Sequence, residues 1–226
     1  MNKTAVTKDI IHFSSLDSTN EWLKREDVPA GTIVRADMQT HGRGRGDHSF
    51  ASPEGGLYFS CLLKGLSDEV SVLLTPKAAA SVCMALEEEC GLKPSIKWVN
   101  DILIDGKKVC GILCEHVGNK YIVGIGINTS TELLPEELKT TAGGIGNVSK
   151  DALIEKIADI LFAPMAKDVL LAEYSRRLGT LGKKVSFLYE GTEMTGTVKG
   201  INEYCNLIIE TDDAFVTLSS GEIKLI

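Results

Sequence analysis

The sequence lacks the features that take a protein into or across a membrane. It has no apolar run close to the roughly 18–20 residues of a membrane-spanning helix. Its first ten residues, MNKTAVTKDI, do not show the charged-then-apolar pattern of a signal peptide. We therefore expect a cytoplasmic protein that makes no membrane contact.

Positive charge is also scarce. Lysine and arginine number 24 against 31 aspartates and glutamates, which gives a formal net charge of −7. Binding nucleic acid in general requires a basic surface that displaces counterions from the phosphates. The composition therefore argues against a general DNA or RNA binder, and any anion that the protein binds is expected at a local site.

Paired cysteines in a CxxC spacing are absent, although the sequence contains six cysteines. Most of them have apolar neighbours, and such a cysteine usually behaves as a small buried hydrophobic residue. We therefore expect free buried thiols in preference to zinc ligands or disulfides. The six are Cys61, Cys83, Cys90, Cys110, Cys114 and Cys205.

Strand signals are clear in the first 179 residues. With 226 residues, 43% of them hydrophobic, the chain can bury a substantial core. Turns at Asp105-Gly106 and Gly118-Asn119 predict hairpins within 95–130, and hence an antiparallel sheet. Further strands are expected before residue 17, within 31–39 and within 55–64.

Helix signals lie between these strands. A turn at Asp17-Ser18 precedes an amphipathic stretch, which Asp17, Ser18 or Thr19 is expected to cap. A second helix is expected with Thr75 as its cap, Pro76 at its first position and Gly91 at its end. A third runs from about Asp151, with Ser149 as cap, to Pro164, and a further helical piece reaches about Leu178.

Beyond Gly179 the pattern changes to short β-rich segments separated by Gly, Asn and Asp turns. Some 45 residues of this kind are typical of a small barrel or sandwich. The sequence therefore predicts an α+β architecture: a mixed, mainly antiparallel sheet packed with helices over residues 1–179, and a small all-β domain over residues 180–226.

The loop THGRGRGDHSF, residues 40–50, alternates Gly42, Gly44 and Gly46 with Arg43 and Arg45. It matches neither the GxxxxGK[ST] phosphate loop nor GxGxxG followed by a helix. Unhindered backbone N–H groups and two guanidinium groups favour a carboxylate or phosphate ligand that the loop encloses. A disordered segment rich in arginine and glycine is the alternative.

Two further stretches carry polar groups among apolar residues. In 97–115, Lys97, Asn100 and Asp101 precede the Asp-Gly turn, and Lys107 and Lys108 follow it. This grouping suits magnesium and a polyphosphate, although a lysine after a turn is often only solvated. In VGIGIN, 123–128, two glycines in a strand suggest close approach of a ligand, or else a bulge or tight packing.

These motifs together resemble the biotin protein ligases. LDSTN (16–20), Gln39 before GRGR, SPEGGLYFS, KWVNDIL with GKKVCGIL, and VGIGIN occur in that family's order and approximate spacing over residues 12–130. The tail ending SSGEIKLI is similar to the family's C-terminal SH3-like β-barrel. The resemblance implies a class II synthetase-like catalytic domain. Only fifteen residues precede LDSTN, so we expect a short form without an N-terminal DNA-binding domain.

The resemblance also implies a reaction. Biotin and ATP form biotinyl-5′-AMP with Mg²⁺, and a lysine of a biotin carboxyl carrier domain then displaces AMP. Repulsion between the carboxylate and the phosphates requires cationic groups, and a glycine-rich lid would exclude water from the hydrolysable adenylate. The family also makes a homodimer plausible, as does an exposed sheet edge.

By the resemblance, the catalytic residues are Lys108, Arg45 and Arg43, and Asp101 is the candidate Mg²⁺ ligand. Biotin is expected to contact Ser18, Thr19, Asn20, Gln39, Gly42, Arg43, Lys108, Gly111, Gly124 and Gly126. ATP is expected to contact Arg43, Arg45, Phe50, Lys97, Trp98, Asn100, Asp101 and Asn128.

The chain departs from the family pattern within the loop. His48 stands where the family has a third arginine, Asp47 where it has glycine or asparagine, and Phe50 where it has tryptophan; Val99 replaces the proline of KWPND. We hypothesise a looser or pH-sensitive lid, because histidine is titratable and arginine is not. A non-catalytic biotin or adenylate sensor and a lipoate protein ligase are the alternatives to a biotin ligase.

Overall fold

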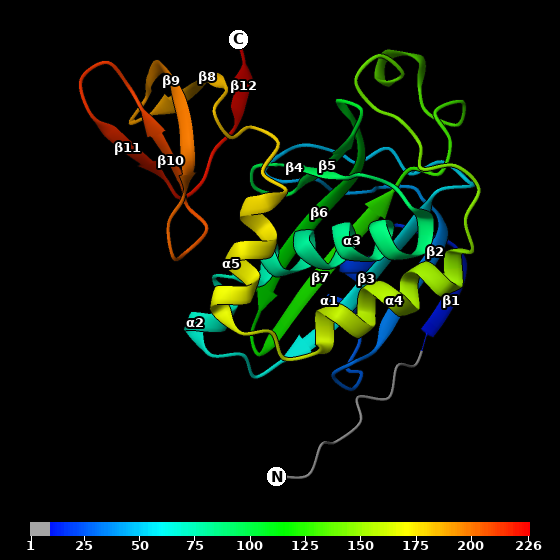
Figure 1. Cartoon of the computed structure of the whole chain (residues 1–226). Coiled ribbons are helices and arrows are strands. Elements are labelled where there is room, and N and C mark those ends of the chain that lie inside the picture. The colour runs from blue at the N-terminus through cyan, green and yellow to red at the C-terminus, as the bar shows by residue number, and fades with distance from the viewer. Residues whose placement is uncertain (1–9) are drawn as a thin grey trace.

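The larger sheet has seven strands, in the order β1-β2-β3-β7-β6-β5-β4 (Figure 1). The computed structural model describes residues 10–226. Only β1 and β2 pair in parallel, and the other neighbours in this sheet are antiparallel, as expected for a mixed, mainly antiparallel sheet. The strands are β1 Ile10–Leu16, β2 Ile33–Gln39, β3 Leu57–Lys64, β4 Ser95–Lys97, β5 Asp101–Ile104, β6 Lys107–Val117 and β7 Lys120–Ile127.

Tight turns set the register of the last four strands. Asp105 and Gly106 both have positive φ, 51° and 78°, as a two-residue hairpin turn requires. Gly118, with φ 60°, begins the turn from β6 to β7. The resulting register places Gly111 of β6 directly opposite Gly126 of β7. Two residues without side chains therefore face one another in the middle of the sheet.

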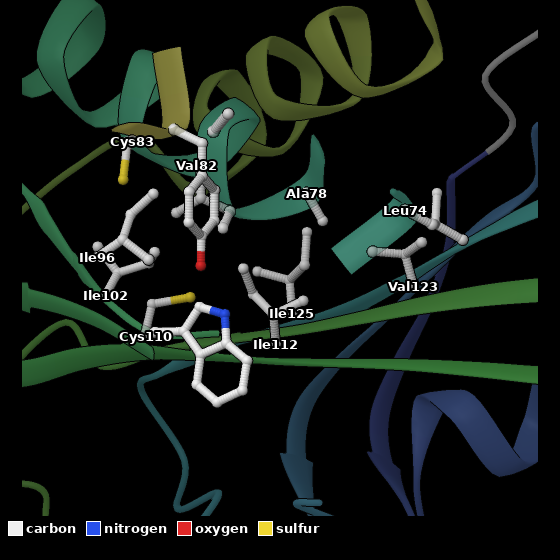
Figure 2. Packing of buried hydrophobic residues seen from close by; sticks show 14 of the residues in the cluster. Leu74, Ala78, Val82, Cys83, Ile96, Ile102, Cys110, Ile112, Val123 and Ile125 are labelled. Carbon is white, nitrogen blue, oxygen red and sulfur yellow. The ribbon is translucent and has the colours of Figure 1, made fainter. Parts of the chain in front are cut away.

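Helices cover both faces of this sheet. The helices α3 and α4 lie across one face, where α3 residues such as Ala78 and Val82 pack against strand residues such as Ile112 (Figures 1 and 2). On the other face Leu23 of α1 packs with Val34 and other strand residues. The helices are α1 Thr19–Arg25, α2 Asp68–Ser71, α3 Leu74–Cys90, α4 Lys150–Phe162 and α5 Lys167–Arg176, with a short 3₁₀ turn, η1, at Glu136–Leu138.

Two of the expected helix starts, those of α1 and α3, are capped differently in the structure. Ser18 occupies the N-cap position of α1 but makes no side-chain cap hydrogen bond. Thr75 is not a cap, because α2 leads through Val72 directly into α3, which already begins at Leu74. Pro76 is consequently the third helical residue. Two other expectations are confirmed. Helix α3 ends at Gly91, which lies in the left-handed region with φ 64°. Ser149 caps the start of α4.

The C-terminal strands form a second, antiparallel sheet in the order β11-β10-β9-β8-β12. The expected all-β character is confirmed, but hydrogen bonds do not close the sheet into a barrel: within residues 10–226, β11 and β12 are its two edges. β12 has three residues and pairs with β8 alone. The strands are β8 Lys184–Tyr189, β9 Thr192–Ile201, β10 Leu207–Glu210, β11 Phe215–Leu218 and β12 Ile223–Leu225.

Hydrogen bonds fasten the turn between β4 and β5 to its surroundings. The indole Nε1 of Trp98 donates to the carbonyl of Cys205, in the loop between β9 and β10, at 2.9 Å. The hydroxyl of Tyr174, on α5, donates to the carbonyl of Val99 at 3.0 Å. The C-terminal sheet and α5 thus hold a turn of the larger sheet. Across residues 10–226, no helix is both long and apolar enough to cross a bilayer.

Candidate active site

A cavity of about 690 Å³ lies at the N-terminal end of α1. The glycine-arginine loop and the turn between β4 and β5 also line it. Nearly all of the expected site residues line it. They are Ser18, Thr19, Asn20, Gln39, Arg43, Arg45, Phe50, Lys97, Trp98, Asn100, Asp101, Lys108, Gly111, Gly124 and Gly126. Residues far apart in the sequence are therefore brought together as the motifs predict.

Gly42 and Asn128 do not line the cavity. A Cβ on Gly42 would lie 2.3 Å from the carbonyl oxygen of Phe50, so Gly42 permits the two ends of the loop to approach. The backbone N–H of Asn128 donates to the carbonyl of Val109 at 2.8 Å, and its carbonyl accepts from Ile145 at 2.9 Å. Asn128 thereby fixes the chain beside Lys108.

One wall of the cavity is a small polar slot. The backbone N–H of Thr19 donates to Oε1 of Gln39 at 2.9 Å, and Nε2 of Gln39 donates to Ser52 at 2.9 Å. The hydroxyl of Ser60 lies 2.7 Å from that of Thr19 and 2.6 Å from Oδ1 of Asn20. Thr19, Asn20, Ser52 and Ser60 are buried and Gln39 is half-buried, and their mutual hydrogen bonds order the slot.

The glycines of β6 and β7 make room for other side chains. A Cβ on Gly111 would lie 2.8 Å from the ring of Phe50, and one on Gly126 would lie 2.5 Å from the same ring. A Cβ on Gly124 would lie 2.3 Å from Oδ1 of Asn20. Phe50, expected among the ATP contacts, thus packs against two glycines expected in the biotin slot.

The glycine-arginine loop is an ordered hairpin, not a disordered segment. Arg43 and Ser49 form an antiparallel bridge, and the N–H of Gly44 donates to the carbonyl of His48 at 2.7 Å. Gly46 has φ 58°, a conformation that favours glycine at the tip of the loop. The backbone conformation therefore directs both arginines toward the cavity that they line.

The two arginines of the loop have different partners. Arg43 forms an ion pair with Glu21 on α1, and its NH1 lies 3.6 Å from Oε1 of Glu115. NH1 of Arg45 lies 3.4 Å from Oδ1 of Asn100 and 3.4 Å from the carbonyl of Gly221. A hydrogen bond from Lys24 holds the pKa of Glu21 below its usual value; burial opposes the shift and a hydrogen bond from Arg43 supports it.

Lys108, on β6, adds a further cation to the two arginines that line the cavity. Nζ of Lys108 lies 2.7 Å from Oδ1 of Asp101 and 5.8 Å from the centre of the Phe50 ring. Asn100 is fixed by a hydrogen bond from its Nδ2 to the carbonyl of Ile112 at 2.8 Å. The neighbouring Lys107 points elsewhere, toward the carbonyl of Lys139 at 3.4 Å.

Several contributing residues were missed by reasoning from the sequence. Gly221 and Glu222, in the loop between β11 and β12, line the cavity, and Oε1 of Glu222 lies 3.1 Å from Nε2 of His48. Ser60 could have been noticed as a hydroxyl inside the apolar strand LYFSCLLK. The sequence around Glu115 and Glu222 contains no motif that would identify either glutamate as part of the site.

Comparisons with known proteins agree with this geometry. The profile of the Biotin/lipoate A/B protein ligase family matches residues 12–131, and that of the biotin protein ligase C-terminal domain matches residues 180–225. The bifunctional ligase/repressor BirA of Bacillus subtilis is 31% identical over 100% of this chain and 75% of its own length.

Solved structures show the same relationship. A biotin protein ligase from Aquifex aeolicus, in complex with biotin and ATP, superposes with a TM-score of 0.84 at 32% identity, covering 97% of this chain and 99% of that one. Among relatives found by sequence, a biotin–[acetyl-CoA-carboxylase] ligase of Mycobacterium tuberculosis is 25% identical over 85% of this chain and 78% of its own length. The chain belongs to the biotin protein ligase family.

Proposed function

We propose that the protein is an ATP-dependent biotin protein ligase. It activates biotin as biotinyl-5′-AMP and transfers the biotinyl group to a specific lysine of a biotin carboxyl carrier domain. The observation that carries the proposal is the arrangement within one cavity: a polar slot at Thr19 and Gln39, and three cations, Arg43, Arg45 and Lys108, around the space beside it.

The slot suits the neutral, polar head group of biotin. Ser18, Thr19 and Asn20 present hydroxyl and amide groups at the start of α1, and Gln39 is held against Thr19 at 2.9 Å. Gly124 leaves room for Asn20, and Gly111 and Gly126 leave room for the ring of Phe50. In this proposal Phe50 forms an apolar wall of the biotin slot, in addition to the expected contact with ATP.

In the first step, a carboxylate oxygen of biotin forms a bond to the α-phosphorus of ATP. The bond from that phosphorus to the bridging oxygen breaks, and pyrophosphate leaves with the electron pair. Both partners are anions, so fixed cations that stabilise the growing negative charge lower the barrier. In this proposal Lys108 and Arg45 take this role, supported by their position in the cavity lining, and Arg43 joins them once it leaves Glu21.

In the second step, the neutral amine of the acceptor lysine attacks the acyl carbon of the adenylate. The bond between that carbon and the phosphate oxygen breaks, AMP leaves, and the amine nitrogen loses a proton as the amide forms. Enclosure by the loop at 40–50 excludes the water that would compete for the same carbon.

Mg²⁺ fits the residues present. This ion is usually held by one or two carboxylates together with substrate phosphates, and Asp101 supplies one carboxylate beside Asn100 and Lys108. In the described chain, no group of three or more His, Cys, Asp or Glu side chains is placed to hold a metal. Bound Mg²⁺ would supply charge neutralisation on the phosphates. Asp101, Lys97, Asn100 and Trp98 would form the surrounding wall.

Further parts of the proposal concern the protein's setting. Five cysteines, Cys83, Cys90, Cys110, Cys114 and Cys205, are free thiols, which suits a reducing cytoplasm. We place the boundary between a ligase domain and a C-terminal domain at residues 179 and 180, and we propose a homodimer formed through an edge of the larger sheet.

The test is ATP–pyrophosphate exchange by purified protein with Mg²⁺, measured with biotin, with lipoate and with neither. Exchange that requires biotin is expected. Exchange with lipoate instead would favour a lipoate ligase. Biotin binding without exchange would favour a sensor, because adenylation would then be absent. Transfer to a purified carrier domain, followed by mass spectrometry of its lysine, tests the second step.

A further inference from the structure

The carboxylate of Glu115, on β6, divides its two oxygens between different partners. Its Oε2 accepts a hydrogen bond from Nδ2 of Asn20 at 2.8 Å. Its Oε1 accepts from Nζ of Lys24 at 2.8 Å and lies 3.6 Å from NH1 of Arg43. One oxygen therefore contacts the slot, and the other contacts Lys24 on α1 and lies near Arg43 of the glycine-arginine loop.

These contacts are part of a series of polar contacts that starts at Phe50, at the end of the glycine-arginine loop, and returns to Arg43 near its start. The carbonyl of Phe50, at the end of the loop, accepts a hydrogen bond from Ser52 at 3.0 Å, and Ser52 accepts one from Gln39 at 2.9 Å. The chain of contacts continues through Thr19, Ser60 and Asn20 to Glu115, and from there to Arg43. Glu115 is the member that joins the slot to Arg43.

Burial gives this carboxylate more influence than a surface ion pair has. The side chains of Glu115 and Lys24 are 17% and 18% exposed, whereas many surface pairs are fully solvated and contribute almost nothing. Burial lowers the pKa of Lys24, but its hydrogen bonds with Glu115 and Glu21 outweigh this effect and the pKa is raised. Lys24 thus stays charged, and Glu115 is held in place by it.

We propose that Glu115 is a positioning residue that couples occupancy of the biotin slot, through Asn20, to the position of Arg43 in the loop. It touches no reacting atom. Its Oε2 holds Asn20 against the slot. Its Oε1, 3.6 Å from NH1 of Arg43, adds to the ion pair that Arg43 forms with Glu21. A ligand that moves Asn20 therefore also changes the charge environment that positions Arg43. The inference rests on the proposed function for the identity of the ligand.

Two substitutions separate the two contacts. Glu115→Gln keeps an oxygen that accepts from Asn20 but places a neutral amide toward Lys24 and Arg43. Glu115→Ala removes both contacts. Glu88→Gln is the matched control, because Glu88 forms an ion pair with Lys156 outside the cavity.

Three measurements are made on each full-length variant. The first is the dissociation constant for biotin without ATP, by calorimetry. The second is the rate of tryptic cleavage after Arg43 and Arg45, with and without biotin. The third is the split between KM for biotin and kcat in pyrophosphate exchange. Thermal midpoints are measured in parallel.

For Glu115→Gln we expect biotin affinity within about twofold of the wild type, because the hydrogen bond to Asn20 is kept. The loss of a charged partner is expected to speed loop cleavage about tenfold. Biotin should then protect the loop less than it does in the wild type, and kcat should fall more than KM rises. Glu115→Ala should also weaken biotin binding about tenfold, while Glu88→Gln should match the wild type in every readout.

The inference would be overturned if both Glu115→Gln and Glu115→Ala matched the wild type in the rate of loop cleavage, in the protection of the loop by biotin and in the affinity for biotin. A parallel loss of thermal midpoint and of all activities in Glu115→Gln would also overturn it, because that result indicates only a structural role. If Glu115→Ala does not fold, Glu115→Gln carries the test alone. Absence of biotin-dependent exchange in the wild type would contradict the proposed function, yet the binding and cleavage measurements would still test the coupling.

Discussion

The ammonium group of Lys108 lies 2.7 Å from the carboxylate of Asp101, across the hairpin formed by β5 and β6. The pair holds the lysine at the cavity wall before any substrate enters. Replacing Lys108 by methionine keeps the apolar stem and removes the charge. Loss of one preorganised group of this kind costs about 100- to 1,000-fold in kcat, and we expect pyrophosphate exchange to fall by that amount.

Lys107→Met is the control for this change. Lys107 is the adjacent residue and its Nζ lies outside the cavity, 3.4 Å from the carbonyl of Lys139. We expect its exchange rate to stay within about twofold of the wild type, as surface substitutions usually do. Equal losses in the two variants would show that the Lys108 effect is not specific.

Gly124→Ala is expected to weaken biotin binding by displacing Asn20. A Cβ at this position would lie 2.3 Å from Oδ1 of Asn20, which is already bonded to Ser60. Overpacking of this kind costs about 1–3 kcal/mol, so we expect KM for biotin to rise about tenfold. In the double variant with Asn20→Ala the clash is relieved, so the rise in KM should be smaller than the sum of the two single effects on the free-energy scale. Fully additive effects of the two substitutions would contradict this explanation.

His48→Arg is expected to slow release of the adenylate. Nε2 of His48 lies 3.1 Å from a carboxylate oxygen of Glu222, and both side chains are largely exposed. Arginine carries a permanent charge on a planar guanidinium that pairs with a carboxylate through two parallel hydrogen bonds, which histidine cannot form. An exposed pair is worth up to about 1 kcal/mol, so the change should not exceed about fivefold. Identical release rates of wild type and variant from pH 6 to 8 would reject a pH-sensitive lid.

Arg177→Met is expected to destabilise the fold strongly. Its guanidinium is 2% exposed and lies between the carboxylates of Glu87 on α3 and Glu173 on α5, each at 2.5 Å. Removing one partner of a buried ion pair costs about 3–5 kcal/mol. Urea denaturation measures this loss. Arg176→Met is the control, because Arg176 contacts the same two glutamates from a position 52% exposed, and about 0–1 kcal/mol is expected there.

The free energy of unfolding should fall above pH 9. Burial raises the pKa of Cys83 from 9.0 to about 12, and burial likewise raises that of Cys205 to about 12. The folded state therefore retains protons that the unfolded state releases, so this stabilisation is present below pH 9 and is lost as pH rises toward 12. Each thiol contributes up to about 1.4 kcal/mol per pH unit in that interval.

The check is urea denaturation of wild type and Cys83→Ser at pH 8, 9, 10 and 11. The variant should show a shallower decline, whatever its stability at pH 8. Parallel declines would mean that Cys83 does not contribute.

Local patterns predicted the hairpins and the site motifs because each depends on a few neighbouring residues. The Asp105-Gly106 turn is an example, since both residues adopt the left-handed conformation that such a turn requires. The start of α3 was predicted incorrectly at Thr75 because α2 leads into it and removes the need for a cap. Local capping rules do not include the preceding element.

Other parts of the site depend on contacts between distant segments. Asn20 meets Glu115 from 95 positions away, and Arg45 meets Gly221 from 176 positions away. Neither contact follows from the spacing of residues within a motif. The position of Phe50 against Gly111 and Gly126 likewise requires the register of β6 and β7 as well as the loop conformation.

The hydrogen bond from the indole of Trp98 to the carbonyl of Cys205 has a consequence for how this protein can be altered. Truncation after residue 179 would remove the acceptor of this indole, next to Asn100 and Asp101. The C-terminal sheet is therefore not a removable appendage. An exchange of this sheet between related ligases is expected to succeed only where the loop that contains Cys205 keeps the same backbone path.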